Sequence, residues 1–383
     1  MKDVVVIAGA LGSSFSICKS IRSKYLIKTY IIFLNSDIEH FSCPTGLVTE
    51  TVNWVADSAN IFFERINEWY SLHTFKELPV LYCTSDESCM FVAQFREWFE
   101  LKFILTIPDN SIINIYNNKG KSDVSIKRTD LLAPKTLTIK THDDIETVKK
   151  AFRFPVIIKP IDYQNQRKIG FKVKVCDSID DYSLQSFGIL SRRIHFLCQE
   201  YIPGGDDKSW FYIFFRMANG TIVDCMGKKI VQHPRGKGNM AMGITCRNEK
   251  LAKISQSFLK KIGYVGIGGI EFKEYMGDFY FIEMSTRPEG FIQISNVAET
   301  PLPLIAYYDA NLEVMDVGRQ FIQKDDRVYV DIIIYLIEII KSRKYIELIS
   351  LLKILFAKKT TFNPLPFSYY MLCLKNFFLV FLK

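Results

Sequence analysis

The sequence predicts a fold of mixed class, α/β and α+β, with an open parallel sheet at the N-terminus, a strand-rich centre and helices at the C-terminus. Three observations predict it. Buried-strand runs alternate with helical segments over residues 1–115, strands separated by Gly-rich turns dominate the middle of the chain, and two strongly apolar helical segments lie within residues 328–357.

The N-terminal region alternates between strand and helix signals. The run VVVIAGA (4–10) predicts a buried strand, LGSSFSICKSIRSK a Gly/Ser turn and a helix, and YIIFLNSD (30–37) a second strand. A further strand and a helix follow within residues 79–101. This order is typical of an open parallel sheet, and we expect the first module to end near residue 115.

Composition disfavours several classes of protein. Nine scattered cysteines without a CxxC pair, and five histidines that do not cluster, argue against a zinc site or a disulfide framework and favour a reducing cytoplasm. The net charge of +8 suits a nucleotide, a nucleic acid or a membrane surface, and suits a slightly basic housekeeping chain equally well. No basic–aromatic motif accompanies this charge, so we expect no nucleic-acid partner. Gly9 and Gly12 lack the GxGxxG spacing, which favours a tight turn over a nucleotide site there.

The central region predicts a second and a third group of elements. A Lys-rich helix and loop are expected within residues 118–136, strands at 154–160 and 170–176 with a polar loop between them, and a helix opened by Ser178. A hairpin turning at Asn219-Gly220 comes next.

The C-terminal tail, PFSYYMLCLKNFFLVFLK, is the most apolar stretch of the chain. Lys375 splits it and Lys383 ends it, so it falls short of the ~18 uninterrupted apolar residues of a spanning helix. We expect a buried or docking helix, with contact at a membrane surface as the alternative.

Two glutamates lie at opposite ends of the stretch GGIEFKEYMGDFYFIEMSTRPEG. With a three-residue loop centred on Gly277, Glu271 is paired with Glu283, Lys273 with Phe281 and Tyr275 with Phe279. Both glutamates then share one face of the hairpin, where directly opposed like charges are destabilising. Three interpretations remain open: a divalent cation such as Mg²⁺ or Mn²⁺ between the carboxylates, a shared proton, or exposure to screening water.

The residues around this pair favour a phosphate ligand. Ser285 and Arg287 have the parity of Glu283 and point to the same face. A cation, a hydroxyl and a guanidinium together can hold phosphate oxygens, and the Gly-rich approach GYVGIGG allows a ligand close to the backbone.

The segments FPVIIKP, CQEYIPGGDD and GIEFK…FYFIEMSTRP, in this order, resemble the ATP-grasp superfamily of carboxylate–amine ligases, and within it the branch of D-aspartate ligase and carbamoyl-phosphate-synthase-like proteins. The likeness extends to about residue 310. It implies a pre-ATP-grasp domain at 1–115, an ATP-grasp small lobe at 116–195, a large lobe at 196–310 and a C-terminal helical segment at 311–383.

The resemblance also implies roles for individual residues. The lysines that contact ATP phosphates are Lys159, Lys119 and one of Lys228 and Lys229. The hinge that meets adenine comprises Glu200, Tyr201 and Ile202, and Asp207 matches the acid that holds the ribose. The metal ligands are Glu271, Glu283 and Ser285, and the catalytic cations are Arg287 and Lys229. The family usually has Asn where Ser285 stands, and its phosphate-covering loop is usually richer in glycine than IDYQNQRKIG.

The expected activity is that of an ATP-dependent ligase with Mg²⁺ or Mn²⁺, which joins a carboxylate to an amine through an acyl phosphate. The substrates would be small molecules, such as an amino acid or a sugar acid of cell-wall or surface-polysaccharide assembly. We expect the acceptor pocket between the first module and the loop after Arg287, with Glu289, Gln293 and Asn296 as polar candidates. A cytoplasmic protein is expected, with a homodimer allowed for. The alternative is a non-catalytic ATP-binding protein that keeps the fold.

Overall fold

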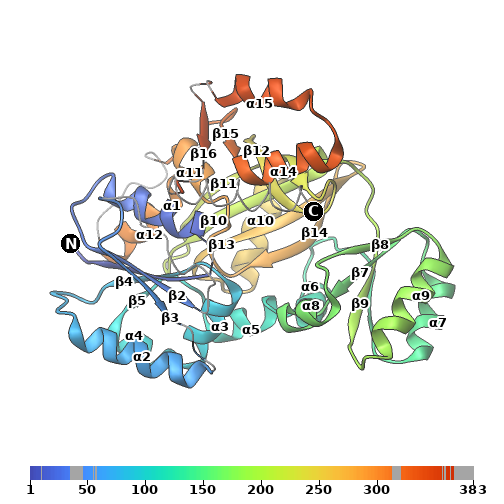
Figure 1. Cartoon of the computed structure of the whole chain (residues 1–383), viewed down its shortest axis with the longest axis horizontal. Coiled ribbons are helices and arrows are strands. Elements are labelled where there is room, and N and C mark those ends of the chain that lie inside the picture. Colours follow the sequence, from blue (N-terminus) through green and yellow to red (C-terminus); the bar gives the residue numbers. More distant parts are fainter. Residues whose placement is uncertain are drawn as a thin grey trace, which may run out of the picture.

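Three sheets lie side by side in the computed structural model, which describes residues 1–9, 11–34, 46–54, 56, 58–312, 321–355, 357, 359–362 and 364–365 (Figure 1). The predicted tail helix at 366–383 lies outside these residues, as does the predicted strand end at Asp37. No helix within the described ranges has the length and apolar character needed to cross a membrane.

The first sheet is open and wholly parallel, as predicted, with strand order β3-β2-β1-β4-β5. Its strands are β1 (Val4–Ala8), β2 (Thr29–Leu34), β3 (Glu50–Trp54), β4 (Val80–Cys83) and β5 (Ile104–Leu105). The helices of this region are α1 (Leu11–Arg22), α2 (Ala59–Leu72), α3 (Asp86–Gln94), α4 (Arg96–Lys102) and α5 (Asn110–Tyr116). The single helix predicted near residues 90–101 is two helices, because the backbone of Phe95 leaves helical geometry between them.

The second sheet has four antiparallel-paired strands in the order β6-β9-β7-β8. They are β6 (Thr136–Ile139), β7 (Val156–Pro160), β8 (Lys174–Cys176) and β9 (Phe196–Glu200), covered by α7 (His142–Ala151) and α9 (Ile179–Leu190). The predicted polar loop after β7 contains a short helix, α8 (Tyr163–Ile169), which Asp162 caps and Gly170 ends with a φ of 89°. Among the described residues, this sheet and its helices have an apolar core of their own, separate from the cores of the other two sheets.

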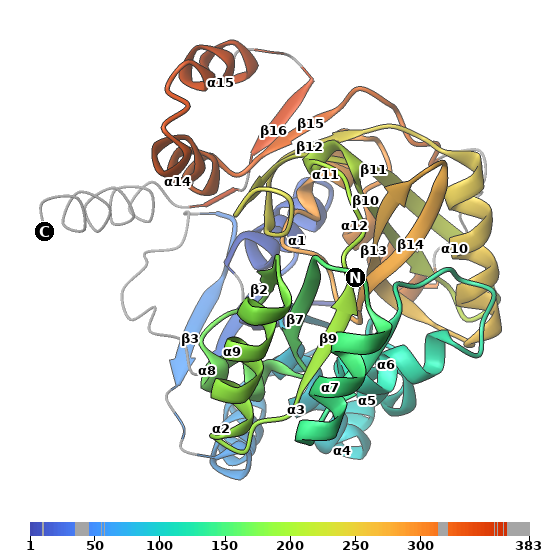
Figure 2. The same ribbon diagram turned by 90° about the vertical axis from the view of Figure 1, so that its right-hand side faces the viewer.

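The third sheet has seven strands in the order β14-β13-β10-β11-β12-β15-β16. They are β10 (Ser209–Arg216), β11 (Ile222–His233), β12 (Asn239–Thr245), β13 (Gly266–Tyr275), β14 (Asp278–Ser285), β15 (Val328–Val330) and β16 (Thr360–Phe362). Accompanying helices are α6 (Lys119–Ile126), α10 (Glu249–Lys261), α11 (Gln293–Val297), α12 (Leu302–Ala310), α14 (Ile332–Ser342) and α15 (Glu347–Leu355). The first predicted C-terminal helix therefore begins after β15 rather than at residue 328, and α14 packs on β11 and β12 (Figure 2).

One apolar core joins the first sheet to the third. Val4, Phe15 and Ile31 from the N-terminal region pack in the same cluster as Ile213 and Ile305. The helices α1 and α12 lie between the two sheets and supply much of this cluster. The two sheets therefore stabilise one another.

The interior of the third sheet has no room for a side chain at Gly227. A Cβ there would overlap the backbone carbonyl of Ile244 and the ring of Phe211. We predict that Gly227→Ala lowers the free energy of unfolding in urea by about 2 kcal/mol or more. The matched control is Gly188→Ala in α9, where nothing lies within 4 Å and the helix gains up to about 1 kcal/mol. Equal stabilities of the two variants would contradict the packing.

Candidate active site

The two glutamates of the hairpin face each other, as predicted: Glu271 of β13 is the direct partner of Glu283 of β14. The predicted three-residue loop is wrong. The turn has two residues, Met276 and Gly277, with φ of 51° and 81°, and Tyr275 pairs with Asp278 rather than with Phe279. A bulge at residue 282 then restores the pairing of the glutamates.

The bulge has a packing cause. Phe279 and Phe281 are buried in the core on the α10 side of the sheet, together with Phe272. Strict alternation would place Phe281 on the same face as Glu283. The extra residue in β14 lets the aromatic rings enter the core while Glu283 remains on the opposite face, so the predicted pair of Lys273 with Phe281 is replaced by Phe272 with Phe281.

Lysines from three different elements offset the repulsion between the glutamates. Lys229 Nζ of β11 lies 2.5 Å from Glu271 Oε1, and Lys172 Nζ lies 3.2 Å from Glu283 Oε1. Lys119 Nζ at the start of α6 lies 3.9 Å from Glu283 Oε2. Lys172, and then the neighbouring lysines, hold the pKa of Glu283 well below its ordinary value, and Glu283 raises the pKa of Lys172. Both glutamate side chains are only 20–24% exposed, so screening by water alone does not describe the pair.

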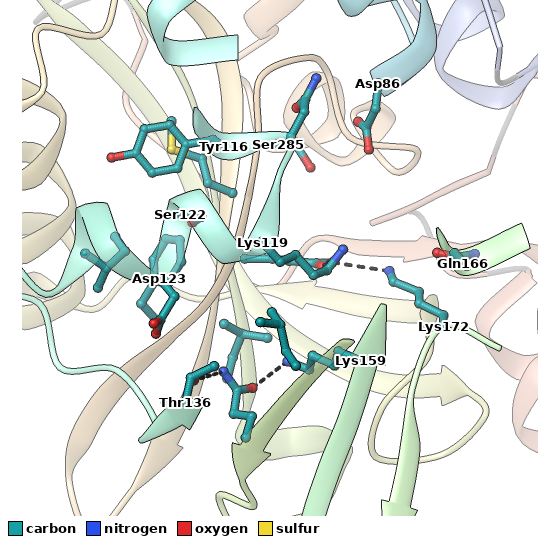
Figure 3. Close-up of a pocket in the computed structure, with 18 of the residues that line it drawn as sticks. Asp86, Tyr116, Lys119, Ser122, Asp123, Thr136, Lys159, Gln166, Lys172 and Ser285 are labelled. Carbon is teal, nitrogen blue, oxygen red and sulfur yellow. Dashed lines mark hydrogen bonds and ion pairs between the residues drawn. The ribbon is translucent and has the colours of Figure 1, made fainter. Parts of the chain in front are cut away.

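A cavity of about 340 Å³ surrounds this charge cluster (Figure 3). Its lining includes Lys119, Lys159, Lys172, Glu283 and Arg287. Figure 3 shows the three lysines approaching the cavity from different elements. Four lysines act on Glu283, whereas Asp86, Glu87 and Asp123 lie elsewhere on the cavity wall, so the part of the cavity next to Glu283 suits a polyanion such as a chain of phosphates.

Lys159 of β7 is the most buried of the three lysines that line this cavity, at 7% exposure. Its Nζ donates a hydrogen bond to Gln199 Oε1 at 2.6 Å, and Gln199 Nε2 donates to Thr136 Oγ1. Burial, together with Lys119 and Lys172, lowers the pKa of Lys159 to about 8, although Glu283 acts in the opposite direction. The local fold positions Lys119 as well, because its backbone N–H donates to the carbonyl of Ile161, which follows β7.

A second pocket adjoins the first and has apolar walls. Ile157 and Val175 of the small sheet and Ile282 of the hairpin line it. The segment Glu200, Tyr201 and Ile202, which connects the two sheets, forms one side. Apolar walls on both sides and backbone groups along one edge suit a planar base.

A third cavity, of about 510 Å³, opens on the other side of the glutamates. Gly9, Gly12 and Ser85 of the first module face Ser285 and Arg287 across it. Glu289, which is 9% exposed, also lines it, and burial raises the pKa of this carboxyl. The structure thus brings the first module and the loop after Arg287 together, where we expect the acceptor pocket. Gln293 and Asn296 do not line it, and instead hydrogen bond to each other and to Thr361 and Ser20.

Arg287 joins the hairpin to the first module. Its Nε lies 2.8 Å from Asp86 Oδ1 at the start of α3, and its guanidinium lies 3.7 Å from Glu289. The first module therefore contributes a carboxylate directly to the site, and sequence reasoning missed it.

Two predicted site residues lie apart from these cavities in the described chain. Lys228 points to the other face of the sheet, where its Nζ lies over the Trp210 ring and 3.9 Å from Glu274. Asp207 is exposed in the short 3₁₀ segment Asp206–Lys208, and its neighbour Asp206 is the buried carboxylate. The alternation of β11 allows only one of Lys228 and Lys229 to face the site, and that residue is Lys229.

The three-sheet arrangement around this site is the ATP-grasp fold. No family model matches the chain. Among solved structures it is similar to an L-amino acid ligase from Bacillus licheniformis, with a TM-score of 0.66, 14% identity, and coverage of 86% of this chain and 78% of that one. It is also similar to an ADP complex of N5-carboxyaminoimidazole ribonucleotide synthetase, with a TM-score of 0.65, 14% identity, and coverage of 90% and 85%.

Two curated proteins are related in sequence, and they confirm the resemblance to ATP-grasp carboxylate–amine ligases. A D-alanine–D-alanine ligase of Pelagibacter ubique (strain HTCC1062) is 26% identical over 172 residues, 40% of this chain and 51% of the relative. A D-aspartate ligase of Enterococcus faecium (strain Aus0004) is 24% identical over 233 residues, 54% of this chain and 53% of the relative. The matched region thus spans about half the length of each relative.

The pKa of Lys159 predicts a pH dependence. The side chain is largely charged at pH 7 and largely neutral above pH 9, because burial brings its pKa to about 8. Affinity for ATP should therefore fall several-fold between pH 7 and pH 9, and Lys159→Arg should remove most of this fall because Arg stays protonated. Titration calorimetry with ATP at both pH values measures it. An affinity that is flat with pH, in the wild type, would contradict a charged role for Lys159.

Proposed function

We infer that the protein is an ATP-dependent ligase that joins a carboxylate to an amine. The observation that carries this function is the opposed pair Glu271 and Glu283, which stands between a cation-lined cavity, a flat apolar pocket and a third cavity against the first module. A nucleotide and a small acid can meet at such a pair. The two sequence relatives and the ligase among the structural neighbours support the same reaction class.

The residues of the hairpin fit a divalent cation. Glu271, Glu283 and Ser285 offer oxygen atoms only, which Mg²⁺ prefers, and no third acid, histidine or cysteine joins them in a metal-binding cluster within the described chain. The remaining positions around the ion would be taken by phosphate oxygens and water. When bound, Mg²⁺ neutralises charge on the transferred phosphoryl group. A structural neighbour from Hydrogenobacter thermophilus was solved with MgADP, which supports magnesium rather than manganese.

The cations of the chain would hold the phosphates in line. Lys159 and Lys172 come from the small sheet and its connections, Lys119 from the start of α6, and Arg287 from the segment after β14, so they would surround the polyphosphate. Positioning and charge stabilisation supply most of the rate enhancement in phosphoryl transfer. Glu200, Tyr201 and Ile202 would meet the adenine edge.

The reaction needs no nucleophilic side chain. A carboxylate oxygen of the acceptor attacks the γ-phosphorus, ADP leaves, and an acyl phosphate forms. The amine then attacks the acyl carbon, inorganic phosphate leaves, and the nitrogen loses a proton as the amide forms.

The third cavity sets the class of substrate. It combines the guanidinium of Arg287, the carboxyl of Glu289 and the backbone near Gly9, which suit an amino acid or a sugar acid. The relatives that act on D-alanine, D-aspartate and L-amino acids support an amino acid. We include a role in cell-wall or surface-polysaccharide assembly in this proposal. Ser285, in place of the Asn usual in the family, is the feature that favours the alternative of ATP binding without turnover.

Paired variants test the site. Glu283→Ala and Lys229→Ala should lower release of ADP and phosphate, with a panel of amino and sugar acids, by about a hundredfold or more, because Glu283 would hold the Mg²⁺ and Lys229 supplies positive charge beside Glu271. Lys228→Ala is the matched control, since this neighbour faces Trp210 and should retain activity. ATP binding without acceptor-stimulated phosphate release in the wild type would favour the non-catalytic alternative.

Ser285→Asn tests the metal site. An amide oxygen is a better ligand for Mg²⁺ than a hydroxyl, so the Mg²⁺ concentration for half-maximal activity should fall several-fold. Ser191→Asn, at the exposed end of α9 and outside all three cavities, serves as the control and should leave the Mg²⁺ requirement unchanged. An unchanged Mg²⁺ requirement in Ser285→Asn would argue against ligation at position 285.

A further inference from the structure

The loop after β11, residues 234–238, forms one wall of the apolar pocket in which we expect the adenine. Gly236, Lys237 and Gly238 line that pocket together with the segment Glu200–Ile202. Two glycines in five residues, one of them with a φ of 76°, give the free loop much conformational freedom. Its place on the pocket therefore depends on the groups that hold it.

Asp206 holds the loop through hydrogen bonds to its backbone. This carboxylate has 7% side-chain exposure, and it accepts hydrogen bonds from the backbone N–H of Gln232 at 3.0 Å and of Gly236 at 2.5 Å. Gln232 Nε2 in turn donates to the carbonyl of Gly238 at 2.7 Å. The loop is thus fixed at both ends to buried polar groups.

Arg235, the second residue of the loop, reaches outward to the C-terminal helices. Its Nη2 lies 3.0 and 2.7 Å from the two oxygens of Glu347 of α15, and its Nε lies 3.1 Å from Glu338 Oε1 of α14. Its Nη1 lies 3.3 Å from Asp206 Oδ2. His233 Nδ1 lies 2.7 Å from the second oxygen of Glu338, whose side chain is 5% exposed. One guanidinium therefore connects three carboxylates from three separate elements.

These contacts are stronger than those of ordinary surface ion pairs. The pairing of Arg235 with Glu347 engages both carboxylate oxygens, and Glu338 is buried, so solvent screens the cluster poorly. Pro234 is the only apolar side chain of the loop, so the loop cannot be held by apolar packing. The carboxylates of α14 and α15 hold it by charge instead. Nothing in the resemblance to ATP-grasp ligases assigns a part in nucleotide binding to these C-terminal helices.

We propose that Glu338 and Glu347 are positioning residues for the nucleotide: through Arg235 they hold the 234–238 loop against the base, so that α14 and α15 set the affinity for ATP. The inference rests on the proposed function only for the identity of the nucleotide. The two glutamates do not touch the ligand, and they act through the loop.

Nucleotide affinity measured without turnover tests the proposal. In the 383-residue chain, Glu347→Gln should weaken MgATP binding by roughly three- to tenfold in titration calorimetry, the equivalent of about one ordinary hydrogen bond. At saturating ATP the maximal rate of phosphate release should stay near that of the wild type, because the chemical groups are untouched. Glu249→Gln, which weakens the 2.8 Å pair with Arg247 at the start of α10, is the control and should leave both values unchanged.

A double-mutant cycle separates this role from a general loss of stability. Arg235→Met alone should weaken ATP binding at least as much as Glu347→Gln does. Adding Glu347→Gln to Arg235→Met should weaken ATP binding no further, because both residues act through one contact. Wild-type affinity in Glu347→Gln, additive losses in the cycle, or a lower maximal rate with unchanged affinity would overturn the proposal. If the wild-type chain binds ATP in a way that depends on Glu347 but shows no ligase turnover, only the proposed function is wrong. If the wild-type chain binds no ATP, both the proposed function and this inference are wrong.

Discussion

Two negative charges set opposite each other on neighbouring strands impose the main constraint on this structure. At an effective dielectric constant near 20, unit charges 4 Å apart interact by about 4 kcal/mol, so Glu271 and Glu283 require nearby cations. Lys229 comes from the same sheet, but Lys119 and Lys172 come from α6 and from the chain entering β8. The pair therefore draws separate parts of the chain onto one hairpin, and the small sheet has no apolar core in common with the hairpin among the described residues.

Glu283 lies where the three cavities meet, because it lines all of them. Its neighbour Ile282 lines the apolar pocket and the cation-lined cavity, whereas Ser285 and Arg287 line the cation-lined cavity and the cavity against the first module. One short segment of the chain therefore contributes to every cavity of the site. Asp86, which lines the cation-lined cavity, pairs with Arg287, and this contact makes the N-terminal module a part of the site.

Much of this arrangement could be predicted from the sequence, and the failures have physical causes. Hydrophobic runs such as residues 4–8 were sufficient to predict the parallel sheet. Side-chain alternation was sufficient to predict that Glu271 and Glu283 face each other. The turn was wrong by one residue because the burial of Phe279 and Phe281, which fixes the bulge, depends on the core beneath them. The sequence around Asp86 and Lys172 does not indicate a site, because their partners Arg287 and Glu283 are distant in the chain. Asp206 is buried and Asp207 is exposed, and sequence spacing alone does not indicate which of two adjacent acids is buried.

The apolar core shared by the first and third sheets has a consequence for evolution and engineering. Tyr82 of β4 donates a buried hydrogen bond of 2.7 Å to the carbonyl of Pro303, and the hydroxyl of Tyr307 in α12 donates to the carbonyl of Lys2. Exchanging the N-terminal module for one with a different acceptor preference would cut through these contacts and expose both halves of the interior. New specificities in such a scaffold are therefore reached more readily by single replacements along the cavity wall than by recombination of whole modules.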